Sequence, residues 1–282
     1  MSAMPDASKI RRAWDLVPAC PPLQFAPVSL GKLSYRSDGA GRALVFLHGL
    51  LGNSQSWAFQ YQHFARTHQV IAWDAPGFGQ FDMVEPSLDA YVSALRDFLD
   101  TFGEQPIDLV GHSMGGTVAA RFAAVYPNRV DRLVLSCTHP GYGQPETAPT
   151  PEKFENRMRE LRDIGPKEYG IRRANELLPR SCPIPVLDYA AELISQANPE
   201  GLRRATRALQ LANNRPLLPK LQMPVLVLTG EKDATVLPML KADLLRLTPI
   251  TRHVDMPGLG HAPYLQAPDV YNSLIDAFLT EL

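Results

Sequence analysis

Short and largely apolar runs recur along this chain of 282 residues. Each run is three to five residues long and lacks the polar alternation of a strand with one solvated face, which is typical of a strand buried on both faces of a sheet. Helix-like stretches separate the runs, so the order predicts an α/β fold, with a mainly parallel sheet covered by helices on both sides. The expected strands are Ala43–Leu47, Val70–Trp73, Ile107–Val110, Leu133–Leu135 and Val225–Leu228, and the expected helices between the first four are Ser56–Arg66, Leu88–Phe102 and Met114–Tyr126.

The beginning of the chain departs from this pattern. The first forty residues are rich in proline and predict an arm followed by short strands near Gly31–Arg36. Charged residues in Met1–Arg12 are not followed by an apolar stretch, so we expect no signal peptide. Elsewhere no apolar run approaches the roughly 18 residues that a membrane span needs. We therefore expect a cytoplasmic protein without a membrane partner.

The strand and helix alternation breaks once, between residues 139 and 220. The loop His139–Pro151 holds many prolines, and an arginine-rich helical stretch follows it until the strand pattern resumes. This break predicts an α/β core made of residues 1–138 and 221–282, interrupted by a helical cap at 139–220. The alternative is that these helices are simply peripheral additions to the core.

Charge is distributed unevenly between these two parts. Residues 152–220 hold 13 Lys and Arg against 9 Asp and Glu, a net charge of +4, and the remainder holds 15 against 20, a net charge of −5. The total of −1 excludes a whole-molecule attraction to nucleic acid or to an anionic membrane. The three cysteines, Cys20, Cys137 and Cys182, are odd in number and lack a CxxC spacing, so we expect a reducing compartment, no zinc site and no disulfide framework.

A G-x-S-x-G motif, Gly111–Gly115, lies between an expected strand and an alanine-rich helix. Small residues around Ser113 allow a sharp reversal that holds the serine in a strained, exposed conformation. The first amides of the following helix lack intrahelical partners and can stabilise an oxyanion. The motif therefore predicts Ser113 as a nucleophile, and the alternative is a structural turn.

A serine nucleophile needs a base and an acid that orients the base. His261 lies in a loop bounded by glycine and proline after the last strand-like segment, His253–Met256, and is the predicted base. His112 abuts the serine but should point elsewhere, while His63 and His68 belong to a helix end and should be solvated. Asp233 directly follows the strand at Val225–Leu228 and is the predicted acid, with Glu231 as its rival and a turn-forming role as the alternative.

The segment His48–Gly52 follows the first buried strand and contains a glycine turn. Such a turn at the carboxyl edge of a sheet can present a backbone N–H to the site, and the alternative is a plain strand-terminating turn. We expect the backbone amides of Leu50 and Met114 to form an oxyanion hole. His112 and Trp57 are candidate substrate contacts, whereas the turn Asp74–Gly79 is expected to be structural.

Five motifs together, HGLLG, DAPGFG, GHSMGG, GEKD and GLGHAP, resemble in their order the α/β-hydrolase fold superfamily. The resemblance implies an eight-stranded, mostly parallel sheet, a triad in the order Ser113, Asp233 and His261, and a helical cap after the sixth strand. GNSQSW and the segment before the strand at 225–228 look like the branch of 3-oxoadipate enol-lactonases and related esterases. Gln80 and Gln266 depart from that pattern, because a serine and an acidic residue are usual there.

Together these features predict a serine hydrolase that cleaves a small carboxylic ester or lactone through an acyl-enzyme. Alternatives on the same residues are a hydrolase of carbon–carbon bonds, an acyltransferase and a ligand receptor. No metal and no organic cofactor are implied, and the oligomeric state stays open. The basic balance of the cap suggests an anionic substrate, although arginines on amphipathic helices are mostly solvated. The candidate arginines are Arg157, Arg159, Arg162, Arg172, Arg173, Arg203, Arg204 and Arg207.

Overall fold

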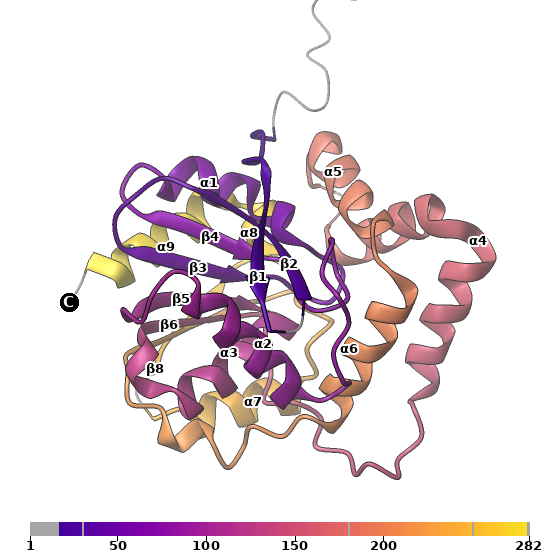
Figure 1. Cartoon of the computed structure of the whole chain (residues 1–282). Helices are drawn as coiled ribbons and strands as arrows, with labels where there is room; N and C mark the ends of the chain where they lie inside the picture. The colour runs from indigo at the N-terminus through magenta and orange to yellow at the C-terminus, as the bar shows by residue number, and fades with distance from the viewer. Residues whose placement is uncertain (1–16, 30, 180, 250, 281–282) are drawn as a thin grey trace, which may run out of the picture.

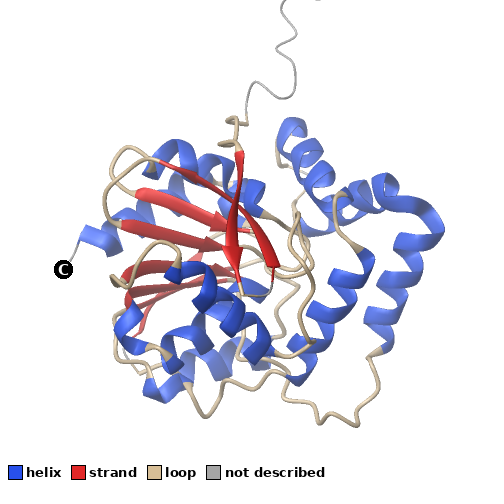
Figure 2. Cartoon of the chain, in the orientation of Figure 1, coloured by secondary structure: helices blue, strands red, loops and turns tan. Residues whose placement is uncertain are grey.

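The protein forms a twisted sheet of eight strands with helices on both faces (Figures 1 and 2). The computed structural model describes residues 17–29, 31–179, 181–249 and 251–280, so most of the expected N-terminal arm and the segment 1–12 lie outside the described residues. Strand order is β1-β2-β4-β3-β5-β6-β7-β8. The strands are β1 Leu23–Val28, β2 Gly31–Asp38, β3 Ala43–Leu47, β4 Gln69–Trp73, β5 Ile107–His112, β6 Val130–Ser136, β7 Val225–Gly230 and β8 Thr251–Met256.

All pairings from β4 to β8 are parallel, and only the β1–β2 and β2–β4 pairings are antiparallel. This confirms the α/β class and the five strands expected from the apolar runs. β1 was not expected as a separate strand, because its sequence, LQFAPV, contains Pro27 and has no continuous apolar run. An edge position tolerates proline, since one side of an edge strand makes no ladder hydrogen bonds.

Two hydrophobic cores lie on the two faces of the sheet. Along β3, Val45 and Leu47 belong to one core, while Leu44 and Phe46 belong to the other. Successive side chains of a strand point to opposite faces, so a strand covered on both sides is apolar at every position. Helices α2 (Leu88–Asp100) and α3 (Met114–Val125) contribute to the first core, and α1 (Ala58–Phe64) and α9 (Pro268–Thr280) contribute to the second.

The helix expected at Ser56–Arg66 is present as α1, which is shorter than expected and begins at Ala58. A 3₁₀ turn at Ser54–Trp57 precedes α1, and Asn53 caps it by accepting a hydrogen bond from the amide of Gln55. This capping fixes the side chain of Trp57 toward the interior of the protein, where it is fully buried. The remaining elements of the core are α7 (Pro238–Leu247) and α8 (Pro263–Gln266).

Three helices lie between β6 and β7, and we call residues 139–220 the α4–α6 segment. The helices are α4 (Glu152–Leu177), α5 (Ile184–Ser195) and α6 (Pro199–Leu211), and they lie beside the carboxyl ends of the parallel strands (Figure 1). Helix α4 is broken at Gly165 (φ 78°, ψ 163°), directly before Pro166. The helical character expected for 139–220 is therefore present, and its status as a separate cap stays a prediction.

Helix α6 rests directly on the core. Gly201 lies so close to Gly77, in the turn after β4, that a Cβ atom at either position would overlap the backbone of the other. The α4–α6 segment is joined to the core by the chain at both of its ends, and this contact holds it against the core at a further point between them. No helix in the described part of the chain is both long and apolar enough to cross a membrane.

Candidate active site

Ser113 occupies a sharp turn between β5 and α3, as the G-x-S-x-G motif predicts. Its backbone has φ 52° and ψ −117°, a region that residues other than glycine rarely adopt. Gly115 makes the turn possible, because a Cβ atom there would overlap the backbone of Leu47 at the end of β3. The turn directs the Ser113 side chain into a cavity at the carboxyl edge of the sheet.

The three residues predicted as a triad form one hydrogen-bonded chain. His261 Nε2 lies 3.0 Å from Ser113 Oγ, and His261 Nδ1 lies 2.9 Å from Asp233 Oδ2. Asp233 follows β7 and His261 follows β8, so loops at the same edge of the sheet bring the two residues to Ser113. With Nδ1–H donated to the carboxylate, Nε2 is left as the acceptor for the serine hydroxyl.

The environment of Asp233 keeps its carboxylate ionised. Burial on its own would raise the pKa of Asp233, but the hydrogen bonds from His261 and from the amides of Thr235 and Val236 lower that pKa overall. Glu231, the rival acid, is exposed and instead accepts a hydrogen bond of 2.7 Å from the amide of Gly258. Glu231 therefore supports the loop that carries His261, and within the described part of the chain the hydrogen bonds of the His261 ring go to Asp233 and Ser113.

The segment His48–Gly52 lies against the serine turn, as expected for an oxyanion hole. His48 Nε2 accepts a hydrogen bond from the amide of Ala75, so its Nδ1–H donates to the carbonyl of Gly49. This bond fixes the peptide that carries the Leu50 amide. Among the described residues, neither the Leu50 N–H nor the Met114 N–H has a hydrogen-bond acceptor. Both amides are therefore available to a ligand oxygen.

The two predicted substrate contacts differ in where their side chains lie. His112 lines the cavity, with its ring 4.9 Å from the rings of both His261 and Tyr264. Trp57 does not line the cavity, because its side chain packs in the core between Phe46 and Tyr264. The prediction of a substrate contact at Trp57 is therefore wrong. Tyr264, three residues after His261, was missed and forms the wall that Trp57 supports.

The α4–α6 segment closes the cavity with mostly apolar side chains. The cavity opens to solvent, and the space inside it together with its mouth is about 940 Å³. Leu50 and Leu51 line the side of the core. The side chains from the α4–α6 segment are His139, Tyr142, Phe154, Arg157, Leu177, Leu178, Ala190, Leu193, Ile194 and Leu209.

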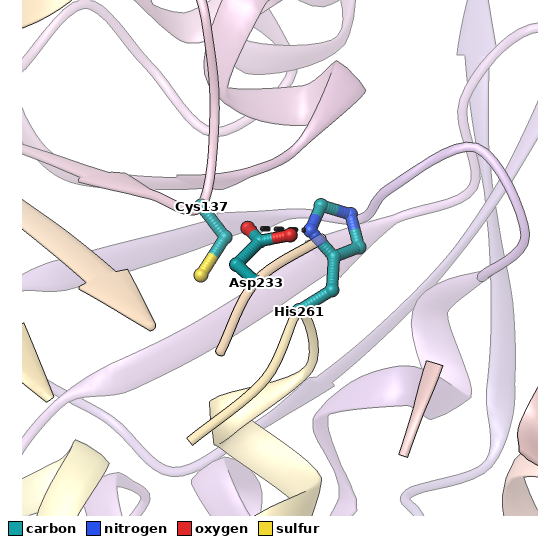
Figure 3. A group of neighbouring side chains, drawn as sticks. All are labelled: Cys137, Asp233 and His261. Atoms are coloured by element: carbon teal, nitrogen blue, oxygen red, sulfur yellow. Dashed lines mark hydrogen bonds and ion pairs between the residues drawn. The ribbon is translucent and has the colours of Figure 1, made fainter. Parts of the chain in front are cut away.

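A cysteine lies beside the acid and the base. Atoms of Cys137, Asp233 and His261 that could bind a metal lie within 4.8 Å of one another (Figure 3). Burial raises the pKa of the Cys137 thiol far above its usual range, whereas a metal ligand must be a thiolate. A metal here would also compete for the oxygen and nitrogen atoms that join Asp233 to His261. The set therefore fits a hydrogen-bonded pair with a protonated neighbour better than a metal site.

Comparison with known proteins agrees with this geometry. A family model described as the alpha/beta hydrolase fold matches residues 42–268. The chain belongs to the α/β-hydrolase family. The match spans the serine turn, Asp233 and His261, and the eight-stranded sheet has the mostly parallel arrangement expected from the resemblance.

Individual known proteins resemble the chain over different lengths. An uncharacterized protein of Mycobacterium tuberculosis is 38% identical over 128 residues, which are 45% of this chain and only 37% of that protein. A provisionally named 2-succinyl-6-hydroxy-2,4-cyclohexadiene-1-carboxylate synthase of Bacillus subtilis is 27% identical, covering 86% of this chain and 92% of its own. A pimeloyl-[acyl-carrier protein] methyl ester esterase of Neisseria meningitidis is 27% identical, covering 85% and 94%. Among solved structures, an enol-lactonase of Burkholderia xenovorans has a TM-score of 0.80 and 23% identity, covering 92% of this chain and 100% of its own.

Two buried histidines of this α/β-hydrolase should make its stability depend on pH. Burial lowers the pKa of His48 and, more strongly, that of His112. Below pH 6.5 the unfolded chain then binds more protons than the folded protein, so we expect the free energy of unfolding to fall as the pH falls. For each histidine the slope should approach about 1.4 kcal/mol per pH unit well below pH 6.5, and the loss between pH 7.5 and 5.5 should total about 1.4 kcal/mol.

Urea denaturation between pH 7.5 and 5.5 measures this dependence. A His112→Gln variant should lose the part of the slope that His112 contributes, because glutamine does not titrate. Parallel curves for the two proteins would contradict the assignment. Asp233 has a lowered pKa, so its contribution should be lost only below its unfolded pKa of about 3.9 and leave this window unaffected.

Proposed function

We propose that this α/β-hydrolase is a serine hydrolase that cleaves a small carboxylic ester or lactone through an acyl-enzyme on Ser113. The observation that carries the proposal is the chain of hydrogen bonds from Ser113 Oγ through His261 to Asp233, at the wall of an apolar cavity. A serine hydroxyl is a poor nucleophile at neutral pH, and a hydrogen-bonded imidazole oriented by a carboxylate is the arrangement that activates it.

In the proposed reaction, His261 Nε2 takes the proton of Ser113 Oγ as the oxygen attacks the substrate carbonyl. The amides of Leu50 and Met114 donate hydrogen bonds to the resulting oxyanion. His261 then gives the proton to the leaving alkoxide, and the carbon–oxygen bond of the ester breaks. A water molecule deprotonated by His261 attacks the acyl-enzyme, and Ser113 is released with the carboxylic acid product. Asp233 stabilises the imidazolium and keeps Nδ1 protonated throughout.

The named activities of the relatives support an acyl substrate. The Neisseria protein is named as a methyl ester esterase and the Burkholderia structure as an enol-lactonase. The Bacillus relative is named as a synthase and not as an esterase. Carbon–carbon bond cleavage, acyl transfer and ligand reception stay as alternatives on the same residues. In our proposal the α4–α6 segment is a cap that closes over the substrate. The three cysteines are free thiols, which suits the proposed cytoplasmic location.

A substrate panel tests the proposed function. Purified protein should hydrolyse 4-nitrophenyl esters of short acids or simple lactones, and added alcohols or amines should yield no more than a minor share of transfer product. Transfer product in excess over acid would favour an acyltransferase. Absence of turnover on every ester, thioester and lactone, together with cleavage of a vinylogous diketone, would favour carbon–carbon hydrolysis instead.

A further inference from the structure

The cavity wall is almost uncharged. Among the residues that the structure describes, it holds one Asp, Glu, Lys or Arg side chain, that of Arg157 in the first half of α4. The other lining side chains are aliphatic, aromatic, small and polar, or histidine. A single cation in an apolar wall is suited to fixing the orientation of a ligand that carries one negative charge.

The other seven arginines predicted as candidates do not line the cavity. Arg172 and Arg173 pair with Glu160, and Arg203 and Arg204 pair with Glu200. Arg207 donates to the carbonyls of Glu146 and Ala148, Arg162 pairs with Asp163, and Arg159 is exposed. Five of these seven arginines are therefore paired with a carboxylate, and Arg157 differs from all seven in lining the cavity.

Arg157 is half-buried, and Glu176 acts on its charge only from beyond ion-pair distance. Within the described ranges it has no ion pair and no hydrogen bond, and its guanidinium carbon lies 5.6 Å from the centre of the Phe154 ring. Burial lowers the pKa of Arg157, which reflects the loss of hydration around its charge. A buried charge without a partner is unfavourable, so an anion entering the cavity would gain from pairing with it.

The wall between Arg157 and Ser113 is a run of aromatic rings. Phe154 lies 6.2 Å from Tyr142, and Tyr142 lies 4.9 Å from His139, measured between ring centres. His139 is next to Thr138, whose hydroxyl donates to the carbonyl of Ser113. Three ring-to-ring or ring-to-cation steps along this wall therefore lie between His139, beside the serine turn, and the guanidinium of Arg157, so a ligand that reaches both would lie along an aromatic wall.

We propose that Arg157 binds a carboxylate of the substrate, at the end of the cavity away from Ser113, and thereby selects monoanionic esters or lactones with an apolar spacer. A guanidinium can bind a carboxylate through two parallel hydrogen bonds, which gives orientation as well as affinity. This inference rests on the proposed hydrolase function, because it assigns the far end of the same substrate.

Two 4-nitrophenyl esters of equal carbon number test it: the neutral hexanoate and the negatively charged adipate half-ester. The wild-type protein should prefer the adipate half-ester in kcat/KM. Arg157→Gln should lower that preference roughly 10- to 100-fold, mainly through KM, because charge-assisted hydrogen bonds are lost. Arg157→Lys should restore part of the preference, since lysine keeps the charge without the paired geometry. The control Arg159→Gln, on the exposed side of the same helix, should keep the wild-type preference.

A binding measurement separates this inference from the proposed function. Calorimetry of monomethyl adipate with Ser113→Ala should give a Kd roughly 10- to 100-fold lower than with the double variant Ser113→Ala/Arg157→Gln. Arg157→Gln should also melt no earlier than the wild type, because it removes an unpaired buried charge. If neither nitrophenyl ester is hydrolysed, the proposed function fails while calorimetry still decides the role of Arg157. Equal preference in wild type and Arg157→Gln, or equal Kd values, would overturn the inference.

Discussion

Replacing Ser113 by alanine should lower kcat/KM for any ester or lactone substrate by at least roughly 10⁴-fold. Alanine keeps the backbone of the turn but removes the oxygen that lies 3.0 Å from His261 Nε2, so no acyl-enzyme can form. The cavity and the two oxyanion amides remain, and substrate binding should change little. Steady-state kinetics on the best substrate of the panel measures the loss.

Covalent labelling adds a second measurement to this prediction. A fluorophosphonate should modify the wild-type protein once, at Ser113, and should leave Ser113→Ala unmodified, as judged by mass spectrometry. Ser195→Ala, at a partly buried position at the end of α5, is the control and should match the wild type in both assays. If Ser113→Ala retained more than a tenth of the activity, Ser113 would not be the nucleophile.

Asp233→Asn should lower kcat about 10³- to 10⁴-fold while leaving the fold intact. The amide has the shape of the carboxylate and can still accept from Thr235 and Val236 through its oxygen. Its NH₂ group, however, would face His261 Nδ1 and favour the imidazole tautomer with the proton on Nε2. In that tautomer His261 cannot accept the proton of Ser113.

Glu231→Gln provides the matched control, because Glu231 lies two residues away and also follows β7. Its carboxylate contacts the amide of Gly258 and not the ring of His261, and glutamine can keep that contact through its oxygen. We expect its kcat to stay within about threefold of the wild type, as is usual for an exposed site that keeps its hydrogen bond. A larger loss in Glu231→Gln than in Asp233→Asn would reverse the assignment of the acid.

The sequence predicted those site residues whose positions depend on the order of strands and loops. Ser113 and Asp233 follow runs of apolar residues, His261 lies in the loop after β8, and the carboxyl ends of parallel strands meet at one edge of a sheet. The inward side chains of the core elements were harder to assign. Trp57 and Tyr264 are both aromatic residues near a motif, and only the capped 3₁₀ turn before α1 directs Trp57 away from the cavity.

The arginines of α4 and α6 show why the net charge of a segment does not identify the residue that would bind an anion. Arg203 and Arg204 lie three and four residues after Glu200, and side chains at these spacings are neighbours on a helix. The sequence alone could therefore have removed these two arginines from the candidates. Glu160 pairs with Arg172 and Arg173 across twelve or more residues, which no straight helix permits. That pairing depends on the break in α4 at Gly165, and a pattern of local spacing contains no information about it.

The break in α4 also has an evolutionary consequence. Arg157 lies before the break and Leu177 lies after it, so both parts of the broken helix α4 supply side chains to the cavity wall. Gly165 has open space around it, and a Cβ atom there would meet nothing within 4 Å. Insertions or deletions at this joint would change the breadth of the cavity without altering the loops of Ser113, Asp233 and His261. Substrate range could therefore diverge among descendants of this protein while the reaction chemistry stayed the same.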